Sequence, residues 1–264
     1  MIRKTILFLQ AFFALVVAGL VQAQADPPVI ITYSTNPTYP PYHWAVGDAA
    51  FDGASIELLE MVRPANVRFQ PLVYPWKRVL GMAALGQIDM LVSLRITPER
   101  QQFLRFTEHR SFPNPIAVFV RSDKAFVFTS WDTLQGRTGG YSAGDTFGAG
   151  FDDYWRQSLK MDEAPTMENN FAKLALGRID YFVTSYYLGQ AYLQSHSDKA
   201  GIIALTPMIS TQDIHFAFSK KFPHQSVINE IDKRLAELNR RGVPEALLKK
   251  HLERFSRNPV IYAP

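Results

Sequence analysis

Strand-like and helix-like patterns of apolar residues alternate along most of the chain. Residues 29–34, 67–73 and 88–94 are short runs rich in β-branched or apolar residues, as in strands. Residues 55–62 and 79–85 have apolar side chains at helical spacing instead. Strands and helices that alternate in this way predict an α/β fold with mostly parallel sheets.

A ten-residue segment occurs twice. Residues 84–93 and 175–184 are identical at six of ten positions, and 91 residues separate them. Each copy contains the end of a helix, a glycine and a strand with a hydroxylated last residue. Repeats of about 20–50 residues indicate solenoids, and this separation is longer. The repeat therefore predicts two similar α/β lobes.

Two apolar strands are expected to carry the chain between these lobes. One spans residues 116–120 and the other residues 214–218, and each passes into a polar segment. The helical pattern of residues 226–255 is expected to return to the first lobe. We therefore expect lobe 1 to comprise residues 26–119 and 216–264, and lobe 2 residues 120–215.

The N-terminus is typical of a secretory signal peptide. Arg3 and Lys4 precede an apolar run over residues 6–21, and residues 23–25 (Ala-Gln-Ala) fit a signal peptidase site. The alternative, an uncleaved membrane anchor, is less well supported because the run is short for a span of about 20 residues. We expect residues 1–25 to form a signal peptide that is cleaved after Ala25, so that the mature protein is exported.

The composition excludes several classes of protein. The chain has 264 residues, of which 47% are hydrophobic and 20% charged, and it has no cysteine. Disorder, thiol catalysis and zinc ribbons are excluded on these grounds. The net charge of +4 gives little support for nucleic-acid binding. The six histidines lack paired ligand spacing, so we predict no metal site and no cofactor.

The candidate chemistry lies after the repeated strands. In open α/β sheets, ligands bind beyond the carboxyl ends of the strands. Ser93 is the last residue of one copy of the repeat and Arg95 follows it, and Ser185 follows the other copy. Thr97 is placed to cap a short helix that carries Arg100 back toward this point. A guanidinium group is well suited to clamp a carboxylate, so we predict that Arg100 does so.

A glycine-rich stretch supplies the second candidate surface. Residues 137–150 contain five glycines and include Asp145 and Thr146. A loop of this kind that enters a helix exposes main-chain N–H groups to an anion. Aromatic residues are expected either to line the pocket or to lie in the core, namely Tyr39, Tyr42, Trp44, Trp76 and Tyr141.

The same stretch also matches the nucleophile elbow of serine hydrolases. Residues 140–144 read Gly-Tyr-Ser-Ala-Gly. The elbow requires a hydrophobic strand before it, and residues 134–138 are a poor strand. The match of three positions therefore carries little weight, although histidines that could serve as a base follow it in the chain.

The chain resembles the family 3 bacterial extracellular solute-binding proteins, the polar amino-acid-binding components of ABC transporters. The resemblance covers nearly all of residues 26–255 and implies an α/β, two-lobed periplasmic-binding-protein fold, type II-like, with two hinge crossovers. The segments that carry it are Tyr-Pro-Pro-Tyr at 39–42, Phe-Asp-Gly at 51–53, Gly-Gln-Ile-Asp at 86–89, Ile-Thr-Pro-Glu-Arg at 96–100 and Gly-Arg-Ile-Asp at 177–180.

The resemblance also implies roles for individual residues. Arg100 matches the arginine that holds the ligand α-carboxylate, and Ser93 and Thr146 match its hydrogen-bonding neighbours. Ser185 stands where an aspartate usually pairs with the ligand ammonium. Two alternatives are open: Asp145 from the neighbouring loop takes that place, or the ligand is not a standard α-amino acid. Arg95 stands where a small residue is common. The predicted ligand-binding residues are Tyr42, Trp76, Ser93, Arg95, Arg100, Tyr141, Asp145, Thr146 and Ser185.

We therefore expect a periplasmic, monomeric binding protein without catalytic activity. It would deliver a small carboxylate-bearing, amino-acid-like solute to an inner-membrane ABC permease. Two alternatives stay open. One is an enzyme on the same scaffold, similar to periplasmic dehydratases of cyclohexadienyl acids, with Asp145 as its acid. The other is a soluble sensor protein that binds a similar ligand.

Overall fold

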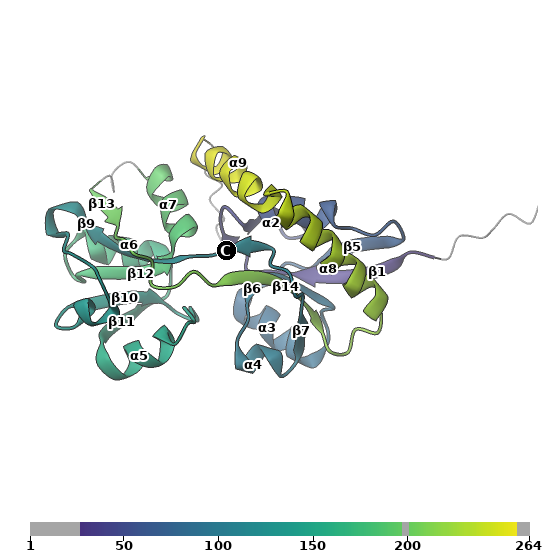
Figure 1. Ribbon diagram of the computed structural model, residues 1–264, viewed down its shortest axis with the longest axis horizontal. Coiled ribbons are helices and arrows are strands. Elements are labelled where there is room, and N and C mark those ends of the chain that lie inside the picture. Colours follow the sequence, from purple (N-terminus) through teal and green to yellow (C-terminus); the bar gives the residue numbers. More distant parts are fainter. Residues whose placement is uncertain (1–26, 197–200, 258–264) are drawn as a thin grey trace, which may run out of the picture.

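The protein consists of two α/β lobes that lie side by side along its long axis (Figure 1). The computed structural model describes residues 27–196 and 201–257, so the expected signal peptide lies outside the described residues. Each lobe contains one twisted sheet with helices on both faces. The expected two-lobed α/β fold with two crossovers is confirmed.

The first lobe is built on a sheet with the strand order β5-β1-β6-β14-β7, and β8 also pairs with β14. β1, β5 and β6 are parallel, and β14 is antiparallel to them. Helices α2, α8 and α9 cover one face and α3 the other. The elements are β1 (Val29–Ser34), α2 (Ala54–Met61), β5 (Val67–Pro71), α3 (Trp76–Leu85), β6 (Met90–Arg95), α4 (Pro98–Gln101), β7 (Leu104–Phe106), β8 (Phe112–Pro113), β14 (Asp213–Ser219), α8 (Gln225–Arg240) and α9 (Val243–Arg257).

The second lobe repeats this topology with the strand order β11-β10-β12-β9-β13. β10, β11 and β12 are parallel, and β9 is antiparallel to β12. A small sheet of β2 (Thr38–Tyr39), β3 (His43–Ala45) and β4 (Phe51–Asp52) belongs to the first lobe. The second-lobe elements are β9 (Ile116–Arg121), η1 (Ser122–Lys124), η2 (Trp131–Leu134), β10 (Thr138–Ser142), α5 (Phe151–Ser158), β11 (Lys160–Ala164), α6 (Met167–Ala175), β12 (Tyr181–Ser185), α7 (Tyr186–Ser195) and β13 (Ile202–Ala204).

The repeated aspartate has the same structural role in both lobes. Asp89 Oδ2 accepts hydrogen bonds from the main-chain N–H of Thr32 at 2.9 Å and from its hydroxyl group at 2.7 Å. Asp180 Oδ2 accepts a hydrogen bond from the main-chain N–H of Thr138 at 2.7 Å. Each aspartate thus ties the start of one central strand to the neighbouring strand. The aspartate of the repeat therefore belongs to this joint between strands and not to the binding site.

The chain crosses between the lobes slightly earlier than the sequence suggested. All of β9 pairs in the second sheet, and all of β14 pairs in the first. The expected boundaries at residues 119/120 and 215/216 therefore divide these two strands. The crossovers lie before Ile116 and before Asp213, because strand pairing, which depends on distant residues, decides where each lobe begins.

The glycine-rich stretch is not a single loop. Residues 138–142 form β10 in the middle of the second sheet, and only the residues that follow are a loop leading to α5. Gly139 has no room for a Cβ atom because the ring of Tyr181 and the sulfur of Met161 occupy that space. The glycines of β10 allow neighbouring side chains to pack closely against this inner strand. A strand of this kind is not recognised from the pattern of apolar residues.

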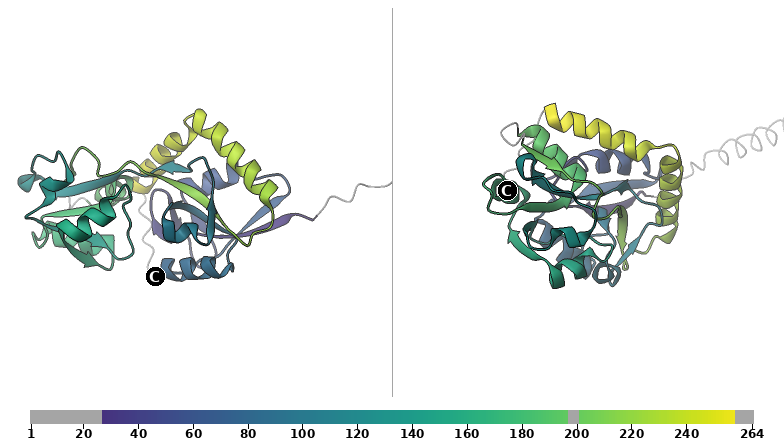
Figure 2. Two further views of the ribbon diagram at one scale, coloured as in Figure 1. Left: turned by 60° about the horizontal axis from the view of Figure 1, so that its bottom comes forward. Right: turned by 60° about the vertical axis from the view of Figure 1, so that its left-hand side comes forward.

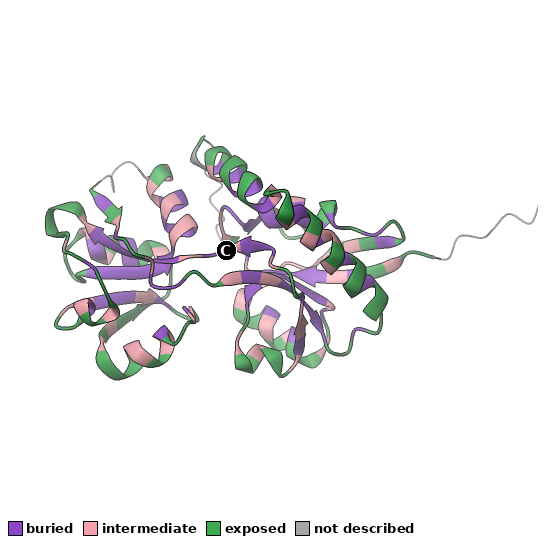
Figure 3. Cartoon of the chain, in the orientation of Figure 1, coloured by how far each residue is buried: buried purple, intermediate pink, exposed green. Residues whose placement is uncertain are grey.

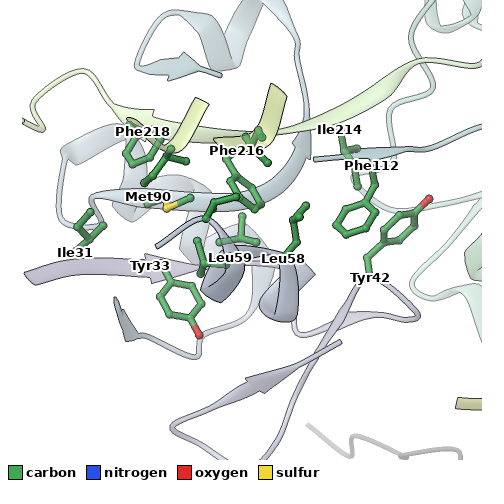
Figure 4. Close-up of a cluster of buried hydrophobic side chains, with 14 of the residues drawn as sticks. Ile31, Tyr33, Tyr42, Leu58, Leu59, Met90, Phe112, Ile214, Phe216 and Phe218 are labelled. Carbon is green, nitrogen blue, oxygen red and sulfur yellow. The ribbon is translucent and has the colours of Figure 1, made fainter. Parts of the chain in front are cut away.

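Burial follows the layers of the fold. The central strands are mostly buried, whereas the outer faces of the helices are exposed (Figure 3). In the first lobe the core lies between the sheet and helices α2, α8 and α9, and Tyr42 lies at its edge beside Phe112 (Figure 4). Figure 2 shows α8 and α9 meeting at an angle over this lobe. Within the described residues, no helix has both the length and the apolarity that a bilayer crossing requires.

Gly53 provides a test of the start of α2. Its φ is 122°, and a Cβ atom there would collide with the Tyr42 carbonyl oxygen and lie 2.7 Å from His43 Cα. We expect Gly53→Ala to lower the free energy of unfolding by about 2–4 kcal/mol, as measured by urea denaturation. The control is Gly81→Ala in α3, where the new Cβ meets no atom within 4 Å. This control should raise stability by about 0.5–1 kcal/mol, and equal effects of the two variants would contradict the account.

Candidate functional site

A cavity with about 480 Å³ of space, partly open to solvent, lies between the two lobes. It is bounded by the carboxyl ends of β1 and β6, the first turns of α3 and α4, the first crossover and the loop after β10. A second, wider space of about 1180 Å³ shares four of its lining residues. The residues around the first cavity are Thr35, Asn36, Tyr39, His43, Trp76, Ser93, Leu94, Arg95, Arg100, Asn114, Gly144, Asp145, Thr146 and Ile214.

Arg100 is presented by the short helix α4, as the sequence predicts. The Thr97 hydroxyl oxygen caps this helix by accepting a hydrogen bond from the Arg100 main-chain N–H at 3.3 Å. The Arg100 Nη1 group then reaches back and donates to the Arg95 carbonyl oxygen at 2.9 Å. Its guanidinium carbon lies 5.8 Å from the centre of the Trp76 ring. Burial, and then the charge of Arg95, lower the pKa of Arg100 to about 10.

Arg95 is the last residue of β6 and is only 5% exposed. Its Nη2 group donates to the Asn114 carbonyl oxygen at 3.1 Å, and its Nη1 group donates to two oxygen atoms of Gln212 at 3.4 Å. Burial lowers the pKa of Arg95. Within the described parts of the chain, no ion pair joins either Arg95 or Arg100 to a carboxylate. The cavity therefore holds two guanidinium groups without a negative partner at hydrogen-bond distance.

Ser93 occupies a strained position in β6. Its φ is 54°, which residues other than glycine rarely adopt. It lies where two residues of β6 face one residue of β14, so the strand has a bulge there. The Ser93 hydroxyl group donates to the Ser111 hydroxyl at 2.9 Å, which in turn donates to the Ile214 carbonyl oxygen at 2.9 Å. Strained residues that surrounding contacts hold in place cluster at functional sites.

The second lobe contributes Gly144, Asp145 and Thr146 from the loop between β10 and α5. Burial raises the pKa of Asp145 from 3.8 to about 7, while Arg95 acts in the opposite direction. The N–H groups of Phe147 and Gly148 donate to the Asp152 carboxylate at 2.8–3.2 Å, so they are not available to an anion. Those of Gly144 and Thr146 have no partner in the described chain, and both residues line the cavity. The expected anion-binding loop is thus reduced to these two groups.

Asn114, in the first crossover, connects the two lobes behind the cavity. Its Nδ2 group donates to the Tyr39 hydroxyl oxygen at 3.1 Å. Its Oδ1 atom accepts hydrogen bonds from the Ser185 hydroxyl group at 2.6 Å and from the Tyr42 hydroxyl group at 3.3 Å. Side chains from both lobes therefore converge on one amide. The sequence analysis did not identify Asn114, and its only local signal is a position between two prolines.

Six of the nine predicted site residues line the cavity together: Trp76, Ser93, Arg95, Arg100, Asp145 and Thr146.

The other three, Tyr42, Tyr141 and Ser185, do not line the cavity. Tyr42 is fully buried in the first-lobe core, and Tyr39, which stacks on it at 5.4 Å, faces the cavity instead. The Tyr141 hydroxyl group donates to Glu163 at 2.7 Å, and its ring lies against Trp155. Ser185 is held by Asn114 and is 3% exposed.

Other lining residues had no role in the sequence analysis. Thr35 and His43 are bonded to each other at 2.7 Å between the Thr35 hydroxyl oxygen and His43 Nε2. Burial lowers the pKa of His43 to about 3. These residues are brought to the cavity by the pairing of β1 with its neighbours and by the small β2–β4 sheet. Among the described residues, no group of three or more metal-ligating side chains is placed to hold a metal ion.

The nucleophile-elbow match has no support from the geometry. Ser142 is the last residue of β10, and the loop over residues 143–150 separates it from α5, so it does not lie at a sharp turn between a strand and a helix. Its hydroxyl oxygen accepts a hydrogen bond from Asn170 Nδ2 at 3.3 Å, and no histidine of the described chain is hydrogen-bonded to it. The arrangement that activates a serine nucleophile is therefore not formed among these residues.

Comparisons with known proteins agree with the fold. The model of the bacterial extracellular solute-binding proteins, family 3, matches residues 31–254. A probable amino-acid-binding protein of Bacillus subtilis is 22% identical over 258 residues, with 94% of each chain covered. The octopine-binding periplasmic protein of Rhizobium meliloti is 23% identical over 223 residues and covers 75% of this chain and 74% of its own. A crystal structure of the substrate-binding protein of an amino acid ABC transporter is 18% identical, with a TM-score of 0.65 over 85% of this chain and 99% of that one.

The raised pKa of Asp145 predicts how stability depends on pH. Between its ordinary value of 3.8 and about 7, the folded protein holds a proton that the unfolded chain has released, so stability falls as the pH rises through this range. Asp145→Asn removes this cost. We expect it to raise the thermal midpoint of the unliganded protein more at pH 8 than at pH 5. The control is Asp48→Asn on the exposed surface, and a pH-independent effect of Asp145→Asn would contradict the prediction.

Proposed function

The chain belongs to the bacterial extracellular solute-binding proteins, family 3, and we propose that it captures a small carboxylate-bearing, amino-acid-like solute between its two lobes. Members of this family are extracellular or periplasmic solute-binding proteins. We place the mature protein in the periplasm, where it would deliver the solute to an inner-membrane ABC permease. The relatives that are named as amino-acid-binding and octopine-binding proteins support this class of ligand.

The observation that carries the proposal is the unpaired guanidinium group of Arg100 in the cavity between the lobes. A partly buried cation without a carboxylate partner is costly, and an anionic ligand removes that cost. In the proposed complex, Arg100 binds the ligand carboxylate from the first lobe. The free N–H group of Thr146 binds the same carboxylate from the second lobe, so the ligand joins the two lobes.

Asp145 is the proposed partner for the ligand ammonium group. Ser185, which stands where the family usually has an aspartate, is engaged by Asn114 and does not line the cavity. Asp145 lines it, and its charge, like that of Asp152, favours the charged form of Arg95. A bound ammonium group would stabilise the ionised form of Asp145 and so lower its pKa. Ligand binding and the loss of a proton from Asp145 are therefore expected to be coupled.

Closure of the lobes provides specificity in this account. Polar groups from both lobes find partners only when a ligand of the right shape and charge lies between them. Asn114 contributes because its side chain holds Tyr39 of the first lobe and Ser185 of the second in one hydrogen-bonded group. Rotation of one lobe changes these contacts directly.

One observation favours a second candidate function. A carboxyl group with a pKa of about 7 in a cleft is suited to donate a proton to a leaving group. The second candidate is therefore a periplasmic dehydratase of cyclohexadienyl acids in which Asp145 acts as the general acid. A ligand that binds to the protein without being converted to a product would favour the binding protein over the dehydratase.

A thermal-shift screen of residues 26–264 tests the first candidate. The panel contains amino acids, polyamines and mono- and dicarboxylates, and a ligand that binds only the folded state raises the midpoint in a concentration-dependent way. We expect Arg100→Ala to abolish the shift for every carboxylate ligand. The control is Arg68→Ala, since Arg68 is exposed on β5 and does not line the cavity. An unchanged shift in Arg100→Ala would refute the role of Arg100, and turnover of prephenate or arogenate in the same samples would favour the dehydratase.

A further inference from the structure

The cavity contains more positive charge than one carboxylate requires. Arg95 and Arg100 both line it, and Arg100 donates a hydrogen bond to the carbonyl oxygen of Arg95. The two side chains therefore lie near each other, and each charge disfavours the other. In the described residues, their hydrogen bonds reach only neutral oxygen atoms, those of Arg95, Asn114 and Gln212.

Arg95 is the more enclosed of the two. At 5% exposure, its charge has lost nearly all of its contact with bulk water. Arg95 lines the cavity, and its Nε group has no hydrogen-bond partner among the described residues, since its three hydrogen bonds all come from Nη1 and Nη2. A buried guanidinium group of this kind is normally paired with an anion. One negative group of the ligand satisfies Arg100, and Arg95 still lacks a partner.

A structural role for Arg95 is the competing explanation. Its hydrogen bonds reach the first crossover at Asn114 and the second at Gln212, so it supports both segments that join the lobes. These bonds involve neutral acceptors, and two of the three are long at 3.4 Å. A neutral amide side chain would serve as a donor to the same carbonyl groups without the cost of a buried charge. A role in supporting the two crossovers therefore does not explain why residue 95 carries a positive charge.

We propose that Arg95 forms a second anion subsite beside Arg100, so that the preferred ligand carries two anionic groups and one cationic group. This inference rests on the proposed function and specifies its ligand class. The two guanidinium groups take two carboxylates, and Asp145 takes an ammonium or secondary amine. Acidic amino acids and N-carboxyalkyl amino acids have this charge pattern. The adjoining space is open to solvent and leaves room for a ligand that extends beyond the charged groups.

Matched pairs of ligands test the second subsite by titration calorimetry. Each pair differs only in one carboxylate or carboxamide: L-glutamate and L-glutamine, L-aspartate and L-asparagine, and N-(carboxymethyl)-L-alanine and its carboxymethyl amide. In the wild-type protein, we expect the diacid of at least one pair to bind at least tenfold more tightly than its amide. In Arg95→Gln, this preference should fall to within about twofold, while the affinity for the amide stays within about threefold.

Further variants separate the subsite from a structural role. Arg95→Lys keeps the charge and should keep most of the preference for the diacid. Equal weakening of diacid and amide in Arg95→Gln would show that Arg95 only supports the crossovers, and it would overturn the proposal. If Arg95→Gln does not fold, the wild-type ratio decides, because a diacid that binds no better than its amide also overturns it.

The outcome also distinguishes this inference from the proposed function. If monocarboxylate ligands bind and lose binding in Arg100→Ala, while each diacid binds the wild-type protein no more tightly than its amide, the second subsite is wrong and the binding function stands. If no carboxylate in the panel binds the wild-type protein, both are wrong.

Discussion

Two guanidinium groups enclosed between the lobes, without a carboxylate partner in the described chain, are the constraint on which this account depends. Burial and the nearby charge of Arg95 lower the pKa of Arg100 to about 10, well below the ordinary value of an arginine. A shift of that size corresponds to an unfavourable free energy on the order of 3 kcal/mol for the charged form. A bound anion relieves this cost and is thereby favoured over water. The fold keeps the charge in place because the strand, the capped helix and the crossovers that carry it are fixed by the core.

The two-lobed architecture places the charge of the two arginines where a single ligand can contact both lobes. The first lobe presents both arginines from β6 and α4, and the second lobe brings Asp145 and Thr146 to the opposite wall. Because the groups belong to different lobes, a ligand that satisfies both also joins them. The strained backbone at Ser93 and the hydrogen bonds of Asn114 show that the region between the lobes is specified in detail. This arrangement explains how a binding protein of this family would select a ligand by charge.

Local patterns in the sequence were sufficient to predict the two lobes and the position of Arg100, but not the strand at 138–142 or the contacts around Asn114. The repeat predicted two lobes, and the cap at Thr97 with Arg100 after it predicted the cationic wall, because both features depend on neighbouring residues. The strand at 138–142 was missed because glycines take the place of apolar side chains where Tyr181 packs closely. Tyr42 and Ser185 were expected at the cavity and lie outside its lining, and Asn114 was overlooked, because the contacts of these residues join positions more than 70 apart in the chain.

A crystal structure of the protein with a ligand selected by the thermal-shift screen tests the central claim most directly. We expect a ligand carboxylate to lie between the lobes, with an oxygen atom at about 2.7–2.9 Å from a guanidinium nitrogen of Arg100. A ligand bound elsewhere, or one whose carboxylate faces solvent while Arg100 stays without an anionic partner, would contradict it.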